Sequence, residues 1–250
     1  MKTKKTGKTM RVAGLLLALV LVTSCFVGGT FAKYVTSGTG ADHAKVAKWG
    51  VKVTAHETGD IFASTYDQIE GKDDTVVVTG GKYKVIAPGT KKENAAVVTL
   101  SGTPEVEVKV TYNADHFALT GKWAYNNGQA GSTDEYYCPL IFKITDGTTT
   151  KTIDCMGDGM NSVGDVETAV KNAVKSFSAT YAPNTDLSTK GNEGLKISWE
   201  WPFEGSAAHP NQTDVKDTYL GDLATTTDPA SVNTIPAVYV VVTATVTQVD

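Results

Sequence analysis

Arginine is almost absent from this chain, since Arg11 is the only one among 250 residues. Five of the 23 basic residues lie in the first 32 positions, which contain no acidic residue. The remainder therefore carries 18 basic residues against 27 acidic ones, a net charge near −9. Nucleic acids and anionic membranes bind basic patches, so this composition argues against both as partners.

The chain also lacks the common catalytic signatures. It has no GxSxG elbow, no phosphate-binding loop and no HExxH pair, and its four histidines are scattered. We expect each histidine to lie on the surface or in a loop. The sequence therefore predicts no catalytic, cofactor-binding or metal-binding residues. A weak cation site in the acidic stretch from Phe203 to Thr234 remains open as an alternative, although the spacing of a calcium loop is missing there.

No apolar run is long enough for an ordinary membrane span. The longest, Val12 to Val27, has 16 residues, whereas a span needs about 20. A basic segment precedes this run, and Thr30-Phe31-Ala32 follows it with the small-x-small pattern of a cleavage site. The sequence thus predicts a signal peptide over 1–32, cut between Ala32 and Lys33, and an exported product with no stable membrane span.

Two alternatives to this signal remain. The leader could stay uncleaved as an N-terminal anchor. The stretch Val22-Thr23-Ser24-Cys25 also resembles a lipobox, in which Cys25 would be lipidated and become the first residue. Against lipidation, Phe26 and Val27 continue the apolar run past the cysteine, where a polar tether is usual.

The rest of the chain has the two-residue alternation of β-strands, clearest over Glu105 to Tyr112 and Leu195 to Trp201. Further strands are predicted within Ala44 to Val53 and over Ala237 to Gln248, and long loops over His56 to Asp74 and Phe203 to Thr234. Residues 44–250 are expected to form a single, mostly β domain, an antiparallel β-sandwich, preceded by a flexible segment over 33–43.

One segment has helical periodicity instead. Val163, Val166, Val170, Val174 and Phe177 form the apolar stripe of an amphipathic helix. Ser162 is placed as its N-cap, with Asp165 three residues later in the capping-box position. We expect the stripe to pack on the sheet rather than to bind a partner.

Two cysteines flank a predicted hairpin. Asp146-Gly147 is typical of a two-residue type I′ turn, and this register places Cys138 opposite Cys155 at a non-hydrogen-bonded pair. The sequence therefore predicts a disulfide between them, worth about 3 kcal/mol through loop closure. Two buried free thiols are the alternative, and Pro139 weakens the register because it has no N–H to donate.

The junction GGTFAKY at Gly28 to Tyr34, followed by AKVAKWGVKV, resembles the secreted TasA/camelysin family. The resemblance is best over the leader and first strand, and more diffuse over the APGT turn, SWEWPFE and the closing VTATVTQVD. It implies a jelly-roll-like β-sandwich, a SipW-type signal peptidase as processing partner, and location in the extracellular matrix or on the surface of a Gram-positive-type bacterium.

Fibre-forming members of this family build biofilm-matrix filaments, in which the freed N-terminus adds as a strand to a neighbouring subunit. The resemblance therefore implies a structural protein that self-associates. Strand addition tolerates a plain sequence, but Ser37, Gly38 and Gly40 are poor strand formers, so a flexible tail is the alternative. Two other functions stay open, a camelysin-like metalloendopeptidase and a monomeric surface or adhesion module.

Overall fold

The computed structural model describes residues 13–16, 45–55, 61–63, 65–68, 75–77, 84–203, 209, 212–225 and 234–249. The chain divides into two compact units, 1–47 and 48–250. In the first unit, residues 13–16 form a helical turn. Within the described residues, every helix is too short or too polar to cross a membrane.

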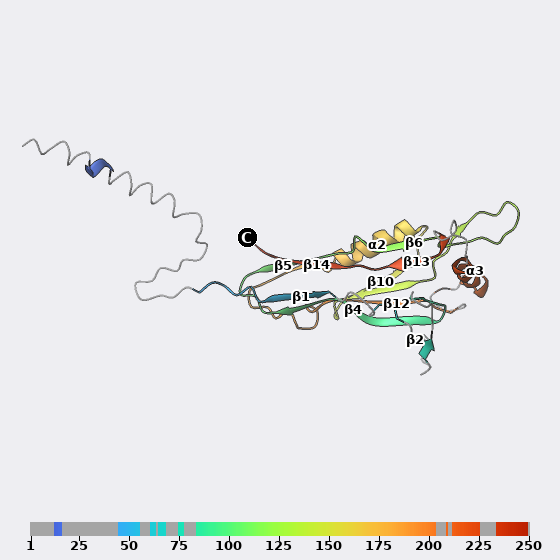
Figure 1. The fold of residues 1–250 in the computed structure, drawn as a ribbon, viewed down its shortest axis with the longest axis horizontal. Coiled ribbons are helices and arrows are strands. Elements are labelled where there is room, and N and C mark those ends of the chain that lie inside the picture. Colours follow the sequence, from blue (N-terminus) through green and yellow to red (C-terminus); the bar gives the residue numbers. More distant parts are fainter. Residues whose placement is uncertain are drawn as a thin grey trace, which may run out of the picture. The chain divides into compact units, whose positions relative to one another are not determined.

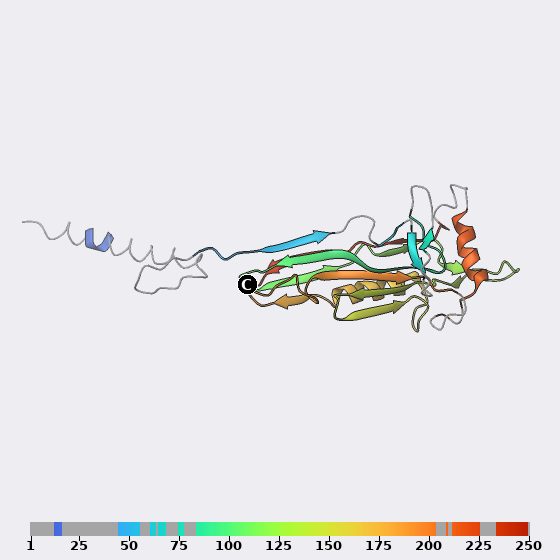
Figure 2. The same cartoon turned by 90° about the horizontal axis from the view of Figure 1, so that it is seen from below.

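The second unit is mostly β and built from antiparallel sheets, as the sequence predicts (Figures 1 and 2). The larger sheet has the strand order β10-β9-β12-β4-β2-β3, and β1 also pairs with β4. Its strands are β1 (Val51–Ala55), β2 (Thr65–Gln68), β3 (Thr75–Val77), β4 (Thr90–Gly102), β9 (Ile141–Thr145), β10 (Thr150–Asp154) and β12 (Gly194–Glu200).

The remaining strands form three smaller sheets with the orders β11-β5-β14, β13-β6 and β7-β8. Their bounds are β5 (Val108–Asn113), β6 (Ala118–Thr120), β7 (Ala124–Tyr125), β8 (Glu135–Tyr136), β11 (Ala179–Tyr181), β13 (Ala237–Tyr239) and β14 (Thr243–Gln248). The strand predicted over Ala237 to Gln248 is thus two strands, with residues 240–242 unpaired between them.

The predicted alternation of apolar and polar residues in two strands identifies side chains of the core. Val108, Val110 and Tyr112 of β5 are buried, as are Leu195, Ile197 and Trp199 of β12. Every second residue of a strand points to the same face, so these side chains line the interior between the sheets.

The predicted amphipathic helix is confirmed as α2 (Val163–Lys175). Ser162 is its N-cap, and the Ser162 side chain accepts a hydrogen bond from the N–H of Asp165. Val166, Val170 and Val174 are buried, and α2 packs against β5, β6, β9 and β10. The helix therefore covers the part of the sandwich that holds β9 and β10, as expected for a stripe that packs on its own sheets.

A second helix, α3 (Asp214–Ala224), lies within the stretch predicted to be a long loop, so that prediction is wrong. Thr213 caps α3, and its hydroxyl oxygen accepts a hydrogen bond from the N–H of Lys216. The buried residues of α3 are Asp217 and Leu220. A helix whose buried face includes a carboxylate has no continuous apolar stripe, which is why the periodicity did not indicate it.

The predicted register of the cysteine hairpin is also wrong. Thr145 pairs with Thr150 and Phe142 with Ile153, so the turn has four residues rather than two. The Asp146 carboxylate organises this longer turn by accepting hydrogen bonds from the N–H groups of Thr148 and Thr149, both at 2.7 Å. Burial acts to raise the pKa of Asp146, but these hydrogen bonds hold it below its usual value. The Asp146 side chain thus stabilises a four-residue turn in place of the expected two-residue type I′ turn.

Candidate functional site

The structure places an incompletely covered strand edge at β1. Val53 pairs with Leu100 of β4, and Ala55 pairs with Val98. Paired residues of neighbouring strands point to the same face, so Val53 and Ala55 point to the core side of the sheet. Leu100 and Val98 are buried there, yet Val53 is 41 % exposed and Ala55 is exposed. The core-side side chains of Val53 and Ala55 are therefore exposed to solvent, although the β4 residues beside them are buried.

A second free edge lies close to the first. Among the described residues, β1 pairs with β4 alone and β14 pairs with β5 alone, so each strand has one edge without a strand partner. β1 and β14 approach each other. Ala244 and Val246 of β14 are only partly buried against the core. We call these two edges, with Val51, Val53, Ala55, Ala244 and Val246, the open edge.

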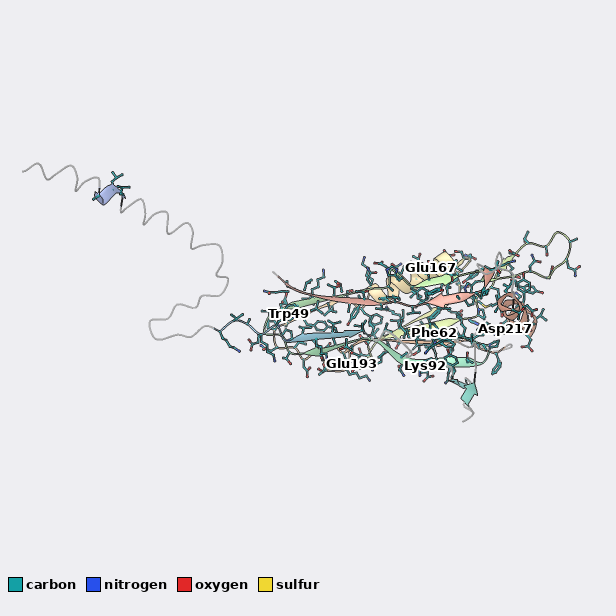
Figure 3. All side chains as sticks on the ribbon, viewed as in Figure 1. Trp49, Phe62, Lys92, Glu167, Glu193 and Asp217 are labelled. Atoms are coloured by element: carbon teal, nitrogen blue, oxygen red, sulfur yellow. The ribbon has the colours of Figure 1, made fainter. Side chains whose placement is uncertain are left out.

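The segment that leads into β1 is fixed by a pair of hydrogen bonds. The Lys48 N–H donates to the Glu105 carboxylate at 2.9 Å, and the Glu105 N–H donates to the Lys48 carbonyl at 2.9 Å. Trp49 is 43 % exposed and lies at the end of this unit away from Asp217 (Figure 3). The entry to the open edge is thus held in place while keeping an exposed indole.

Gly102 permits the close approach of β1 to β4 at this point. Its φ is +108°, and a Cβ atom would lie 1.7 Å from the Gly50 carbonyl oxygen. Any side chain would therefore push β1 away from β4.

The open edge offers backbone chemistry rather than reactive side chains. Unpaired N–H and C=O groups at a strand edge can form a ladder with another extended segment, and exposed apolar side chains beside them give that segment a surface to cover.

The predicted processing residues Cys25, Ala32 and Lys33 lie outside the described residues, as does the segment 33–43. The structure therefore describes the open edge but neither the cleavage site nor the candidate donor segment.

Cys138 and Cys155 are buried free thiols, so the predicted disulfide is not formed. The shifted register explains this, because the Cys155 N–H donates to the Leu140 carbonyl and Cys155 thus lies opposite Leu140. The two cysteines become diagonal neighbours, whose Cα atoms are usually 7–8 Å apart, beyond the usual range for a disulfide. Burial raises the pKa of the Cys155 thiol, and a hydrogen bond with Cys138 raises it further.

Of the two histidines within the described residues, His116 is exposed and His209 lies outside the helices and strands but is buried, whereas His43 and His56 lie outside the described residues. His209 is 2 % exposed, and its Nε2 lies 2.7 Å from Asp154 Oδ1 at the end of β10. No periodic pattern surrounds His209 in the sequence, so only the structure reveals this contact.

The sequence patterns also do not indicate that the carboxylate of Asp217 is buried. The Asp217 side chain accepts hydrogen bonds from the Tyr137 hydroxyl at 2.6 Å, the Trp201 indole N–H at 3.2 Å and the Gln212 amide at 2.8 Å. Burial raises the pKa of Asp217, although these three hydrogen bonds act to lower it. This network fixes α3 to the end of the sandwich.

The outer face of the larger sheet has a hollow of about 190 Å³. Two ion pairs lie in it, Lys91 with Glu93 at 3.1 Å and Lys143 with Glu200 at 3.4 Å. The charges of these side chains are therefore matched within the chain. No group of three or more potential metal ligands occurs in the part of the chain that the structure describes.

Comparisons of the chain with known protein families, with curated proteins and with solved structures find no match.

Proposed function

We propose that this protein is an exported structural subunit that assembles into extracellular fibres of a biofilm matrix or cell surface by strand addition. A SipW-type signal peptidase would remove residues 1–32, and the freed segment 33–43 of one copy would add to the open edge of the next. The observation that carries the proposal is the exposure of Val53 and Ala55 on the core side of a strand with a free edge.

The dimensions fit this arrangement. Eleven extended residues span about 36 Å, and the five residues of β1 span about 17 Å, so the segment can run along the whole strand. Tyr34 and Val35 are neighbours and would point to opposite faces of an added strand, so either register places one of the two apolar side chains over the exposed valine. Each added main-chain hydrogen bond contributes about 0.5–1.5 kcal/mol, which accumulates along a ladder without any special sequence.

The arrangement of the sandwich also supports the proposal. Among the described residues, α2 packs against β5, β6, β9 and β10, whereas β1 and β14 each have one edge without a strand partner. Natural proteins usually protect long free edges with charges, prolines or a covering element. Lys52 places one charge on the outer face of β1, but the inward-facing positions carry Val51, Val53 and Ala55, which give no such protection. The resemblance of the junction at Gly28 to Tyr34 to fibre-forming proteins points to the same function.

A charge at the open edge tests this proposal. In the mature chain Lys33 to Asp250, Val53→Lys places an ammonium group on the core side of β1, where an added strand would bury it. The control is Thr152→Lys, because Thr152 is an exposed residue of β10 at the other end of the strand order. We expect filaments by electron microscopy from the parent and from Thr152→Lys, and monomers from Val53→Lys. Filaments of normal yield from Val53→Lys would refute strand addition at this edge.

A further inference from the structure

A groove of about 410 Å³ lies between α3 and the segment that follows β7. Figure 1 shows α3 at the same end of the unit as the long loop between β7 and β8. The residues that line the groove come from α3, from the end of β7 and from the loop after it: Tyr125, Asn126, Asn127, Asp214, Val215, Thr218, Tyr219 and Asp222. We propose that this groove binds a neutral polysaccharide chain.

Two tyrosines provide a rigid aromatic surface. The rings of Tyr125 and Tyr219 pack edge to face, with centroids 5.5 Å apart. Lys216 Nζ lies 5.6 Å from the centre of the Tyr125 ring, and Lys122 Nζ lies 5.7 Å from that of Tyr219. Lys122 also donates a hydrogen bond to the Tyr219 hydroxyl at 3.2 Å. The rings are thus fixed before a ligand arrives, which lowers the entropic cost of binding.

Polar groups follow the groove at regular intervals. Asp214, Thr218 and Asp222 are four residues apart on α3, so neighbouring members of this row are about 6 Å apart along the helix axis. Asn127 belongs to the opposite wall, where its amide oxygen accepts a hydrogen bond from the Gln129 N–H at 3.0 Å and its NH2 group provides a donor. These groups suit a ligand with many hydroxyls spaced by a few ångströms.

The charges and the apolar contacts narrow the class of ligand. Lys122 is paired with Asp134 at 2.9 Å and Lys216 with Glu135 at 3.1 Å, so both lysines are neutralised by the chain itself. The Asp222 carboxylate also lies in the lining and disfavours anionic polymers. Val215 is 64 % exposed in the same lining and gives an apolar contact. Neutral sugars combine apolar C–H faces with hydroxyls, and both parts find partners here.

The inference is tested by native affinity electrophoresis of the mature chain in gels containing glucomannan, mixed-linkage β-glucan, xylan or hydroxyethylcellulose, with hyaluronan as the anionic contrast. We expect at least one neutral polymer to retard the protein and hyaluronan to have no effect. No retardation by the four neutral polymers, or retardation by hyaluronan alone, would overturn the inference.

Variants locate the binding. Tyr219→Ala removes one ring and should weaken binding about tenfold, as expected for about 1.4 kcal/mol, whereas Tyr219→Phe should retain most of it. The control is Tyr239→Ala, because Tyr239 is exposed on β13 and is not among the groove residues. Asp222→Asn, at an exposed helix position, provides a second test should Tyr219→Ala misfold, and should weaken binding severalfold. Wild-type retardation of both Tyr219→Ala and Asp222→Asn would exclude this groove. The inference is independent of strand addition, since these variants should form filaments normally.

Discussion

The hydrogen bond from Tyr137 to Asp217 allows a quantitative prediction for Tyr137→Phe. The donor oxygen lies 2.6 Å from the carboxylate, and both residues are buried. The substitution keeps the ring in place and removes only the hydroxyl. A buried hydrogen bond to an ionised group is worth about 1.5–3 kcal/mol, so we expect the free energy of unfolding at about pH 7 to fall by this amount.

The loss should depend on pH in a defined direction. Because burial raises the pKa of Asp217 above its unfolded value, the folded state favours the protonated form. The stabilisation that protonated Asp217 gives to the folded state is therefore fully present below the unfolded pKa. This stabilisation is lost as the pH rises through the folded pKa. The Tyr137 hydrogen bond acts to lower this pKa, so the variant raises it further. Once the carboxyl is protonated, Tyr137 makes an ordinary neutral hydrogen bond, and the difference between the variant and the parent should shrink.

Urea unfolding at about pH 7 and about pH 4 measures both effects. At a slope of about 2 kcal/mol/M, a loss of about 2 kcal/mol moves the midpoint by about 1 M. The matched control is Tyr136→Phe, which removes a neutral hydrogen bond from a tyrosine to the Cys155 carbonyl at 3.1 Å. It should cost about 0.5–1.5 kcal/mol at both pH values. Equal losses for the two variants at both pH values would refute the role given to the buried carboxylate.

Three further predictions concern the core and the turns. In the mature chain, Cys138 and Cys155 should both react with iodoacetamide after denaturation without reductant. Neither should react in the native protein, because both are fully buried. A mass two hydrogens lower, with no labelling, would establish a disulfide instead. Val166→Ala in α2 should lower the free energy of unfolding by about 2 kcal/mol, because Val166 is buried. Thr168→Ala, at an exposed position of the same helix, should change it by less than about 0.5 kcal/mol. Similar values for the two variants would contradict the packing of α2. Gly102→Ala should lower the free energy of unfolding by more than about 3 kcal/mol, because the added Cβ would meet the Gly50 carbonyl. Gly128→Ala, also at positive φ but in open space, should lower it by about 1–2 kcal/mol. Calorimetry measures both losses, and equal losses would show that β1 moves aside freely.

The parts of the fold that could be predicted are those in which hydrophobic periodicity and burial agree. The stripe of α2 and the alternation of β5 and β12 correspond to buried residues in the structure. In these elements the pattern of apolar residues is itself the physical cause of the arrangement.

The parts that could not be predicted depend on polar side chains acting at a distance or on the backbone. Asp146 accepts hydrogen bonds from two N–H groups and thereby lengthens the hairpin turn, which moved the cysteines out of register. Asp217 draws α3 onto the sandwich through partners up to 80 positions away in the sequence. Neither effect leaves a periodic signal.

The open edge belongs to a third class. The sequence predicted a strand ending at Val53, but not that its inward-facing side chains would remain exposed. Exposure at a sheet edge depends on which strand lies beside it, and strand order is set by contacts that are distant in the sequence.

The central claim is tested most directly by comparing two chains that differ only in the segment 33–43. Purified Lys33 to Asp250 and Ala44 to Asp250 are followed by sedimentation velocity and electron microscopy under identical conditions. We predict that the longer chain converts from monomer to filaments and that the shorter chain remains a folded monomer. Filaments from both chains, or monomers from both, would contradict assembly by addition of this segment to the open edge.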